Sequence, residues 1–228
     1  LVTLWIILGI EVATTKKVFD DNKPTNYFRR QVKMLKYIMF FGLVGCGAAE
    51  LKTNGLDTAQ AVVEEEIPEQ FGIINTDECD QKHIGSSVCN MVFYDQNMDV
   101  WQLYKHEGKV IVLDFSTVWC GPCQWAGQYT QSIQDDYGDK IEFVTVLVDG
   151  ATGEPPTEEE INEWVSSHGI TTAPVLYADR SVMDQTGETG YLVGGFPTYV
   201  FIDKNLKIHS GVVGFSEEYV RSVIDSLL

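Results

Sequence analysis

The feature that most constrains the fold is a buried-strand pattern that ends at a pair of cysteines and continues as a helix. Residues 109–116 form a nearly continuous run of β-prone apolar side chains, as in a strand covered on both faces. Apolar residues then recur at helical spacing over 121–137, and a second strand pattern covers 141–148. We therefore predict a β-α-β unit with Cys120 and Cys123 where the first strand passes into the helix.

The place of these two cysteines predicts redox chemistry. The free N–H groups and the positive dipole end of the helix N-terminus stabilise a thiolate at Cys120. Cys123 lies one turn into the helix, where its thiol can attack a mixed disulfide formed at Cys120. We interpret Cys120 as the nucleophile, Cys123 as the resolving thiol, and Trp119, Gly121 and Pro122 as the rest of the active-site loop. Pro122 suits the first helical position, where a missing N–H costs least.

The remaining pattern predicts two hairpins, one further strand and two further helices. They are hairpins at 91–104 and 199–212, a strand at 175–177, and helices at 157–168 and 216–228. Thr157 can cap the first of these helices, and Glu160 can return the bond.

Together with Trp-Cys-Gly-Pro-Cys at 119–123, two further stretches of the sequence resemble the thioredoxin superfamily, and more closely its exported TlpA-like thiol–disulfide oxidoreductases. Residues 112–115 read Val-Leu-Asp-Phe, and residues 195–198 read Gly-Phe-Pro-Thr. The resemblance covers about residues 88–228, and the long segment at 150–194 points to the TlpA-like branch. It implies an α/β fold, a thioredoxin-like three-layer α/β/α sandwich with a central mixed sheet and, from the hairpin at 91–104, an N-terminal β-hairpin.

The same resemblance implies roles for single residues and no cofactor. In the family, the acid that matches Asp114 is buried and assists proton transfer to and from the resolving thiol. The proline that matches Pro197 is cis, faces the cysteine pair and offers backbone for pairing with a client protein. Phe196 and Thr198 flank that contact. Thr145 stands near the place of a lysine of thioredoxin, so the proton relay through Asp114 is expected to differ.

The first residues of the chain do not predict a domain. Residues 1–33 show neither alternation nor a helical apolar stripe beyond an opening apolar decamer. We interpret them as an over-extended N-terminus, with the true start near Met34.

The segment that follows predicts export and a lipid anchor. A basic stretch at 29–36 precedes an apolar segment at 37–45, which is the order of a secretory signal. Residues 43–46 read Leu-Val-Gly-Cys, which resembles the lipobox of bacterial lipoproteins. This resemblance implies a signal peptide at 34–45 and a lipid on Cys46, the first mature residue. Because glycine rather than aspartate follows Cys46, we expect the outer membrane more than the inner one.

Charge limits the partners of the chain. Residues 46–87 are polar and acidic and predict a tether. The whole chain carries 16 Lys and Arg against 33 Asp and Glu, a formal net charge of −17. Such a chain lacks the clustered basic residues that neutralise phosphates, so nucleic acid is excluded as a partner. No apolar run approaches the roughly 20 residues of a membrane-spanning helix.

The other cysteines leave alternatives open. Cys79 and Cys89 can form a structural disulfide in an oxidising compartment, or they can be two unpaired thiols near a mobile junction. Their spacing is wrong for the second half of a zinc site, and no metal is predicted. The histidines show no ligand spacing and are interpreted as surface or loop residues; Trp101, Trp125 and Trp164 are interpreted as core or partly buried.

The sequence therefore predicts a lipid-anchored extracytoplasmic thiol–disulfide oxidoreductase. We expect it to reduce client disulfides through Cys120 and Cys123 and to be reduced in turn by a membrane thiol–disulfide electron donor. Residues 117–120 also fit the T-x-x-C of peroxiredoxins, although Leu113 replaces that family's proline. A thiol peroxidase and a non-catalytic binding lipoprotein thus remain as alternatives.

Overall fold

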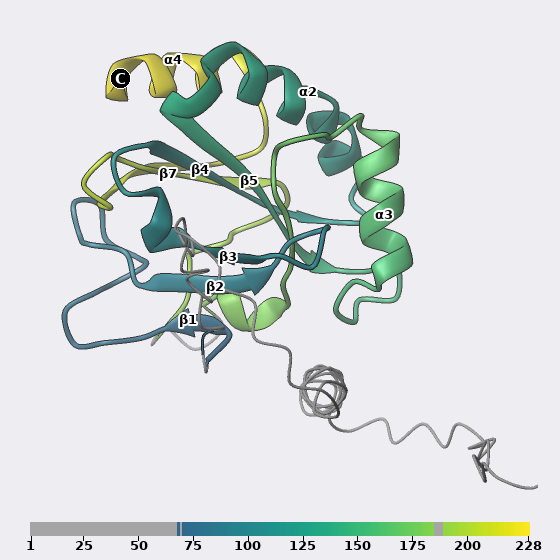
Figure 1. The fold of residues 1–228 in the computed structure, drawn as a ribbon, viewed down its shortest axis with the longest axis horizontal. Helices are drawn as coiled ribbons and strands as arrows, with labels where there is room; N and C mark the ends of the chain where they lie inside the picture. Colours follow the sequence, from purple (N-terminus) through teal and green to yellow (C-terminus); the bar gives the residue numbers. More distant parts are fainter. Residues whose placement is uncertain (1–67, 69, 185–188) are drawn as a thin grey trace, which may run out of the picture. The chain divides into compact units, whose positions relative to one another are not determined.

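The computed structural model describes residues 68, 70–184 and 189–228 (Figure 1). The predictions for the over-extended N-terminus at 1–33, the signal peptide at 34–45, the lipid on Cys46 and most of the tether fall outside these residues. Among the helices described, none is long and apolar enough to cross a membrane.

A five-stranded mixed sheet forms the centre of the domain, in the order β6-β5-β4-β7-β8. The strands are β4 (Val110–Thr117), β5 (Ile141–Asp149), β6 (Val175–Tyr177), β7 (Thr198–Ile202) and β8 (Ile208–Val213). β4, β5 and β6 run parallel, and β7 and β8 pair antiparallel on the other side of β4. Every residue of β4 is buried, as its continuous apolar run predicts for a strand covered on both faces.

All three described α-helices pack on one face of this sheet. They are α2 (Gly121–Tyr137), α3 (Glu158–Ser167) and α4 (Glu217–Leu227). Val112 and Phe143 contact α2 and α4 in one apolar cluster, and Leu147 contacts α3 in another. Alternate residues of a strand share a face, so Phe143 and Leu147 place α3 on the side of α2. The crossovers β4-α2-β5 and β5-α3-β6 step the same way across the sheet, and right-handed crossovers in one direction put their helices on one face.

The opposite face is covered by a second, antiparallel sheet. It consists of β1 (Gly72–Ile74), β2 (Asn90–Tyr94) and β3 (Val100–Gln102), and the 3-10 turns η1 (Leu103–His106) and η3 (Arg180–Val182) complete the layer. A further turn, η2 (Gly138–Lys140), follows α2. β2 and β3 form the predicted N-terminal hairpin, below the central sheet in Figure 1.

The thioredoxin-like α/β fold with a central mixed sheet is confirmed, but the predicted second helical layer is a β-sheet. Phe93, Trp101 and Leu103 supply the apolar cover there, packed against Leu113 and Val146 of the central sheet. Both crossovers place α2 and α3 on the other face, and α4 packs there with α2, so no described α-helix covers this one.

The folded part begins earlier than the predicted boundary at residue 88. β1 pairs with β2, Gly72 opposite Val92, and a disulfide joins Cys79 to Cys89. Residues 70–87 of the predicted tether therefore belong to the domain. A three-residue edge strand that opens on a glycine is too short to show periodicity in the sequence.

Two single-residue predictions are wrong. Trp125, expected to be core or partly buried, is among the exposed large apolar residues at 50%, although its ring meets Tyr129 and Phe215 edge-on. His168, expected at the surface, is 8% exposed. Trp101 and Trp164 are buried as predicted.

Candidate functional site

The cysteine pair lies where β4 passes into α2. Cys120 is the N-cap of α2, and its Sγ accepts a hydrogen bond from the Cys123 N–H at 3.2 Å. The two residues are joined by a disulfide. Cys123 is fully buried, and Cys120 is 6% exposed. After reduction, the same N–H and the helix dipole would face a thiolate on Cys120, which is the form that attacks disulfides.

The active-site loop supplies the first residues of α2. Gly121 is the first helical residue, and Pro122 is the second, one position later than predicted. Pro122 still removes an N–H that has no partner within the helix, because the first four N–H groups of any helix lack one. Trp119, just before the pair, is 52% exposed.

Asp114 is buried in β4, on the sheet face that α2 covers. Its neighbours in register are Thr145 on β5 and Tyr199 on β7. The Ser116 hydroxyl donates to Asp114 Oδ1 at 2.7 Å. Burial, the largest effect, raises the pKa of Asp114 to about 7, while the hydroxyls of Ser116 and Tyr199 act in the opposite direction. This carboxyl can therefore accept and release a proton near neutral pH, although no described hydrogen bond links it to Cys123.

The loop before β7 lies against the cysteine pair. The peptide bond between Phe196 and Pro197 is cis. Phe196 packs against the apolar cluster that contains both cysteines, and its ring meets Trp119 edge-on at 5.8 Å between centroids. The Thr198 hydroxyl donates to the Gly195 carbonyl at 2.6 Å, which tightens the turn into β7. The apolar cluster around the cysteines thus joins distant stretches of the sequence: the start of α2, β5, α3, β6 and the loop at 195–198.

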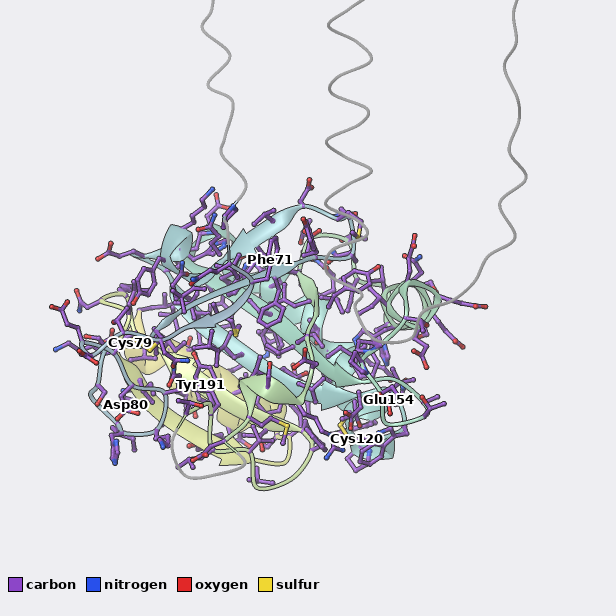
Figure 2. All side chains as sticks on the ribbon, turned by 90° about the horizontal axis from the view of Figure 1, so that it is seen from below. Phe71, Cys79, Asp80, Cys120, Glu154 and Tyr191 are labelled. Atoms are coloured by element: carbon purple, nitrogen blue, oxygen red, sulfur yellow. A yellow bond between two sulfur atoms is a disulfide. The ribbon has the colours of Figure 1, made fainter. Side chains whose placement is uncertain are left out.

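The second disulfide is not part of this site. Cys79 and Cys120 lie at opposite ends of the domain in Figure 2. This disulfide joins Cys79 to Cys89 and so closes the loop that leads into β2. The sulfur of Cys79 also accepts hydrogen bonds from the backbone N–H and the hydroxyl of Thr76. Within the described ranges, no group of three or more His, Cys, Asp or Glu side chains is arranged to hold a metal ion.

Sequence reasoning missed one contact network around the cysteine pair. The Gln124 side-chain amide donates to the Val118 carbonyl at 2.8 Å, and the Gln124 carbonyl lies 3.0 Å from His168 Nε2. The one signal in the sequence is Gly127, where a Cβ would lie 2.8 Å from the His168 ring. A helical glycine can be recognised without a structure, but the residue that it makes room for cannot.

Comparison with known proteins agrees with this geometry. The family model for thioredoxin matches residues 92–177. The thioredoxin of Coprinus comatus is 31% identical over 109 residues, which are 47% of this chain and 90% of that protein. This chain belongs to the thioredoxin superfamily. Its cysteine pair, at the start of α2, falls within the matched residues.

Two further comparisons show similarity to a thiol–disulfide oxidoreductase and to a lipoprotein thioredoxin. The thiol-disulfide oxidoreductase ResA of Oceanobacillus iheyensis is 33% identical over 116 residues, 50% of this chain but only 54% of that protein. The crystal structure of an exposed lipoprotein thioredoxin from Streptococcus pneumoniae has a TM-score of 0.51 and 26% identity, and covers 60% of this chain and 99% of that one. The domain thus resembles those of thioredoxin-like thiol–disulfide oxidoreductases, and the predicted resemblance is confirmed.

Proposed function

We propose that this protein is a lipid-anchored extracytoplasmic oxidoreductase that reduces disulfides in client proteins. The observation that carries the proposal is the cysteine pair at the N-terminus of α2, with the cis Phe196–Pro197 loop packed beside it and buried Asp114 on the sheet face under α2. Each of these features supports one step of thiol–disulfide exchange.

The reaction begins with the reduced pair. The Cys120 thiolate attacks one sulfur of the client disulfide, forming a mixed disulfide and releasing the other client sulfur as a thiolate. Cys123 then loses its proton, and its thiolate attacks Cys120 Sγ. The second client thiolate leaves, and the Cys120–Cys123 disulfide remains. Two electrons have passed to the client, whose thiolates take up two protons.

Asp114 is the group that we assign to the proton of Cys123. A carboxyl whose pKa lies at about 7 is ionised often enough to accept a proton and is neutral often enough to return it. An exposed carboxyl, ionised at all pH values above about 5, would return a proton poorly.

The surface around the pair suits a client segment in extended conformation. We assign Phe196, Pro197 and Thr198 to client binding. Trp119 offers an exposed apolar ring whose edge contact with Phe196 continues this surface.

The proposals for the lipid anchor and the electron donor rest on the sequence and its family resemblance, not on the residues that the structure describes. We propose that Cys46 carries the lipid, that the anchor lies in the outer membrane, and that a membrane thiol–disulfide donor reduces the spent disulfide. The similarity to a pneumococcal protein named an exposed lipoprotein thioredoxin supports an extracytoplasmic place.

Insulin reduction with dithiothreitol tests the reaction. We expect activity in the wild type, none in Cys120→Ser, and client adducts held through Cys120 in Cys123→Ser. A Cys79→Ser/Cys89→Ser double variant, which leaves the pair intact, is the control for lost cysteines. Equal rates in wild type and Cys120→Ser would overturn the proposal, and consumption of peroxide without insulin reduction would replace it by a thiol peroxidase.

Metabolic labelling with an alkyne fatty acid tests the anchor. We expect label on the wild type and none on Cys46→Ser. Equal labelling of both proteins would remove the lipid assignment and leave the exchange reaction untouched.

A further inference from the structure

His168 is a buried histidine that the proposed function does not use. It is the C-cap of α3 and 8% exposed. Its ring lies on Trp164, with 4.4 Å between centroids. On the other side, α2 passes so closely that only glycine fits at residue 127, since a Cβ there would lie 2.8 Å from His168 Cδ2. The imidazole is therefore held in one orientation between α2 and α3.

Both ring nitrogens of His168 face backbone carbonyl oxygens. Nδ1 lies 2.7 Å from the Trp164 oxygen, and Nε2 lies 3.0 Å from the Gln124 oxygen. A carbonyl oxygen only accepts hydrogen bonds, and a neutral imidazole carries one N–H. In either neutral tautomer, one ring nitrogen would therefore turn its lone pair toward an oxygen lone pair. Only the doubly protonated imidazolium donates to both oxygens.

The nearby hydroxyl of Ser167 does not remove the need for a proton on both ring nitrogens. Ser167 Oγ lies 3.3 Å from Nδ1, but its hydroxyl donates to the same Trp164 oxygen at 3.2 Å. A tautomer without a proton on Nδ1 would still leave that nitrogen 2.7 Å from the oxygen.

Burial opposes a positive charge on this ring, but two features of its surroundings favour one. The C-terminal end of a helix is the negative end of its dipole, and His168 caps α3 there. The Trp164 ring lies where it can make a cation–π contact. The contacts described for His168 include no charged side chain. On the two helices packed against it, the ionisable residues adjacent in sequence to its partners Gln124 and Trp164 are Cys123 on α2 and Glu163 on α3.

We propose that His168 is an imidazolium that positions the first turn of α2 and stabilises the Cys120 thiolate. Its partner Gln124 directly follows Cys123. The Gln124 N–H donates to the Cys120 carbonyl at 3.0 Å, and its side chain donates to the Val118 carbonyl. His168 thus holds Gln124, whose hydrogen bonds reach Val118, just before the active-site loop, and Cys120 within it. It also adds a positive charge to the turn where the thiolate forms.

The charge of His168 can be measured without any variant. Long-range proton–nitrogen NMR spectra of the ¹⁵N-labelled wild type at pH 7 report whether each ring nitrogen carries a proton. We expect two protonated nitrogens for His168. A spectrum with one protonated and one bare nitrogen would overturn the proposal.

The effect on Cys120 needs variants and a pH profile, and this part rests on the proposed role of Cys120. The reduced protein is alkylated with iodoacetamide from pH 5 to 9.5. We expect His168→Gln, which keeps one donor but no charge, to react about three- to tenfold more slowly than wild type at low pH and equally fast at pH 9.5. His168→Phe keeps the ring on Trp164 and should behave alike, whereas His209→Gln, at an exposed position on β8, should match wild type.

The outcomes separate this proposal from the proposed function. Identical profiles for His168→Gln and wild type, or a loss of rate by the same factor at every pH, would overturn the role of the charge. Failure of the wild type to reduce insulin would overturn the proposed function but leave the NMR result and the alkylation profile unchanged.

Discussion

Replacing Asp114 by asparagine tests the electrostatics at the centre of the site. Burial raises the pKa of this carboxyl from its ordinary value of 3.8 to about 7 in the folded protein. Between these two values the folded state binds more protons than the unfolded state, so the free energy of unfolding falls as pH rises. The penalty is absent below the unfolded pKa and complete above the folded one.

The size of the penalty follows from the shift. About three pKa units at about 1.36 kcal/mol each give about 4 kcal/mol of lost stability above pH 8. Asp114→Asn keeps a similar shape and an oxygen for the Ser116 hydroxyl, but it carries no charge at any pH. We expect the variant to be more stable than wild type, with an advantage that grows by about 2 kcal/mol between pH 5.5 and pH 8.5.

Urea unfolding of the oxidised protein at these two pH values measures the difference, because the structure describes the disulfide form. Glu142→Gln is the control. Burial opposes ionisation of Glu142, but hydrogen bonds from His106 and Lys109 lower its pKa, so its charge stabilises the fold. That variant should lose stability at both pH values. If the advantage of Asp114→Asn were the same at pH 5.5 and pH 8.5, or negative at pH 8.5, burial would not be what keeps the carboxyl neutral.

Three further changes probe separate parts of the domain. Tyr199→Phe removes a hydroxyl that lowers the pKa of Asp114. In urea unfolding at a series of pH values, the fall in stability with rising pH should therefore extend to a higher pH in the variant than in wild type. The same pH dependence in both proteins would show that Tyr199 does not act on Asp114. Cys79→Ser with Cys89→Ser opens a ten-residue separation and should cost about 2–3 kcal/mol in guanidinium unfolding, with insulin reduction retained. Thr157→Ala breaks the capping box of α3 and should cost about 1 kcal/mol by thermal unfolding, a loss that an unchanged melting temperature would contradict.

The sequence was a good guide wherever one local rule decides the structure. The helix at 121–137 and the strand at 175–177 have the predicted bounds, because turn residues and apolar spacing mark their ends. The capping box of Thr157 and Glu160 forms as predicted, because its three-residue spacing is itself the geometry of a first helical turn. Asp114 is buried as expected, because its neighbours along β4 are apolar.

Prediction from the sequence failed where a residue's surroundings come from distant parts of the chain. Trp125 is apolar but 50% exposed, because how far a helix residue is buried depends on what packs against it. His168 is polar but buried, because α2 leaves room for its ring at Gly127, 41 positions earlier. No periodicity encodes such a pair.

By itself, the sequence determined the order of strands and helices from residue 90 on, the cysteine pair at the start of a helix and the family to which this arrangement belongs, because each depends on neighbours in the chain. Only the tertiary structure decided which layer covers each face of the sheet, how far the carboxyl of Asp114 is shielded from water and what the His168 ring contacts. These properties arise from packing and desolvation among segments that are far apart in the chain, and local propensity does not contain them.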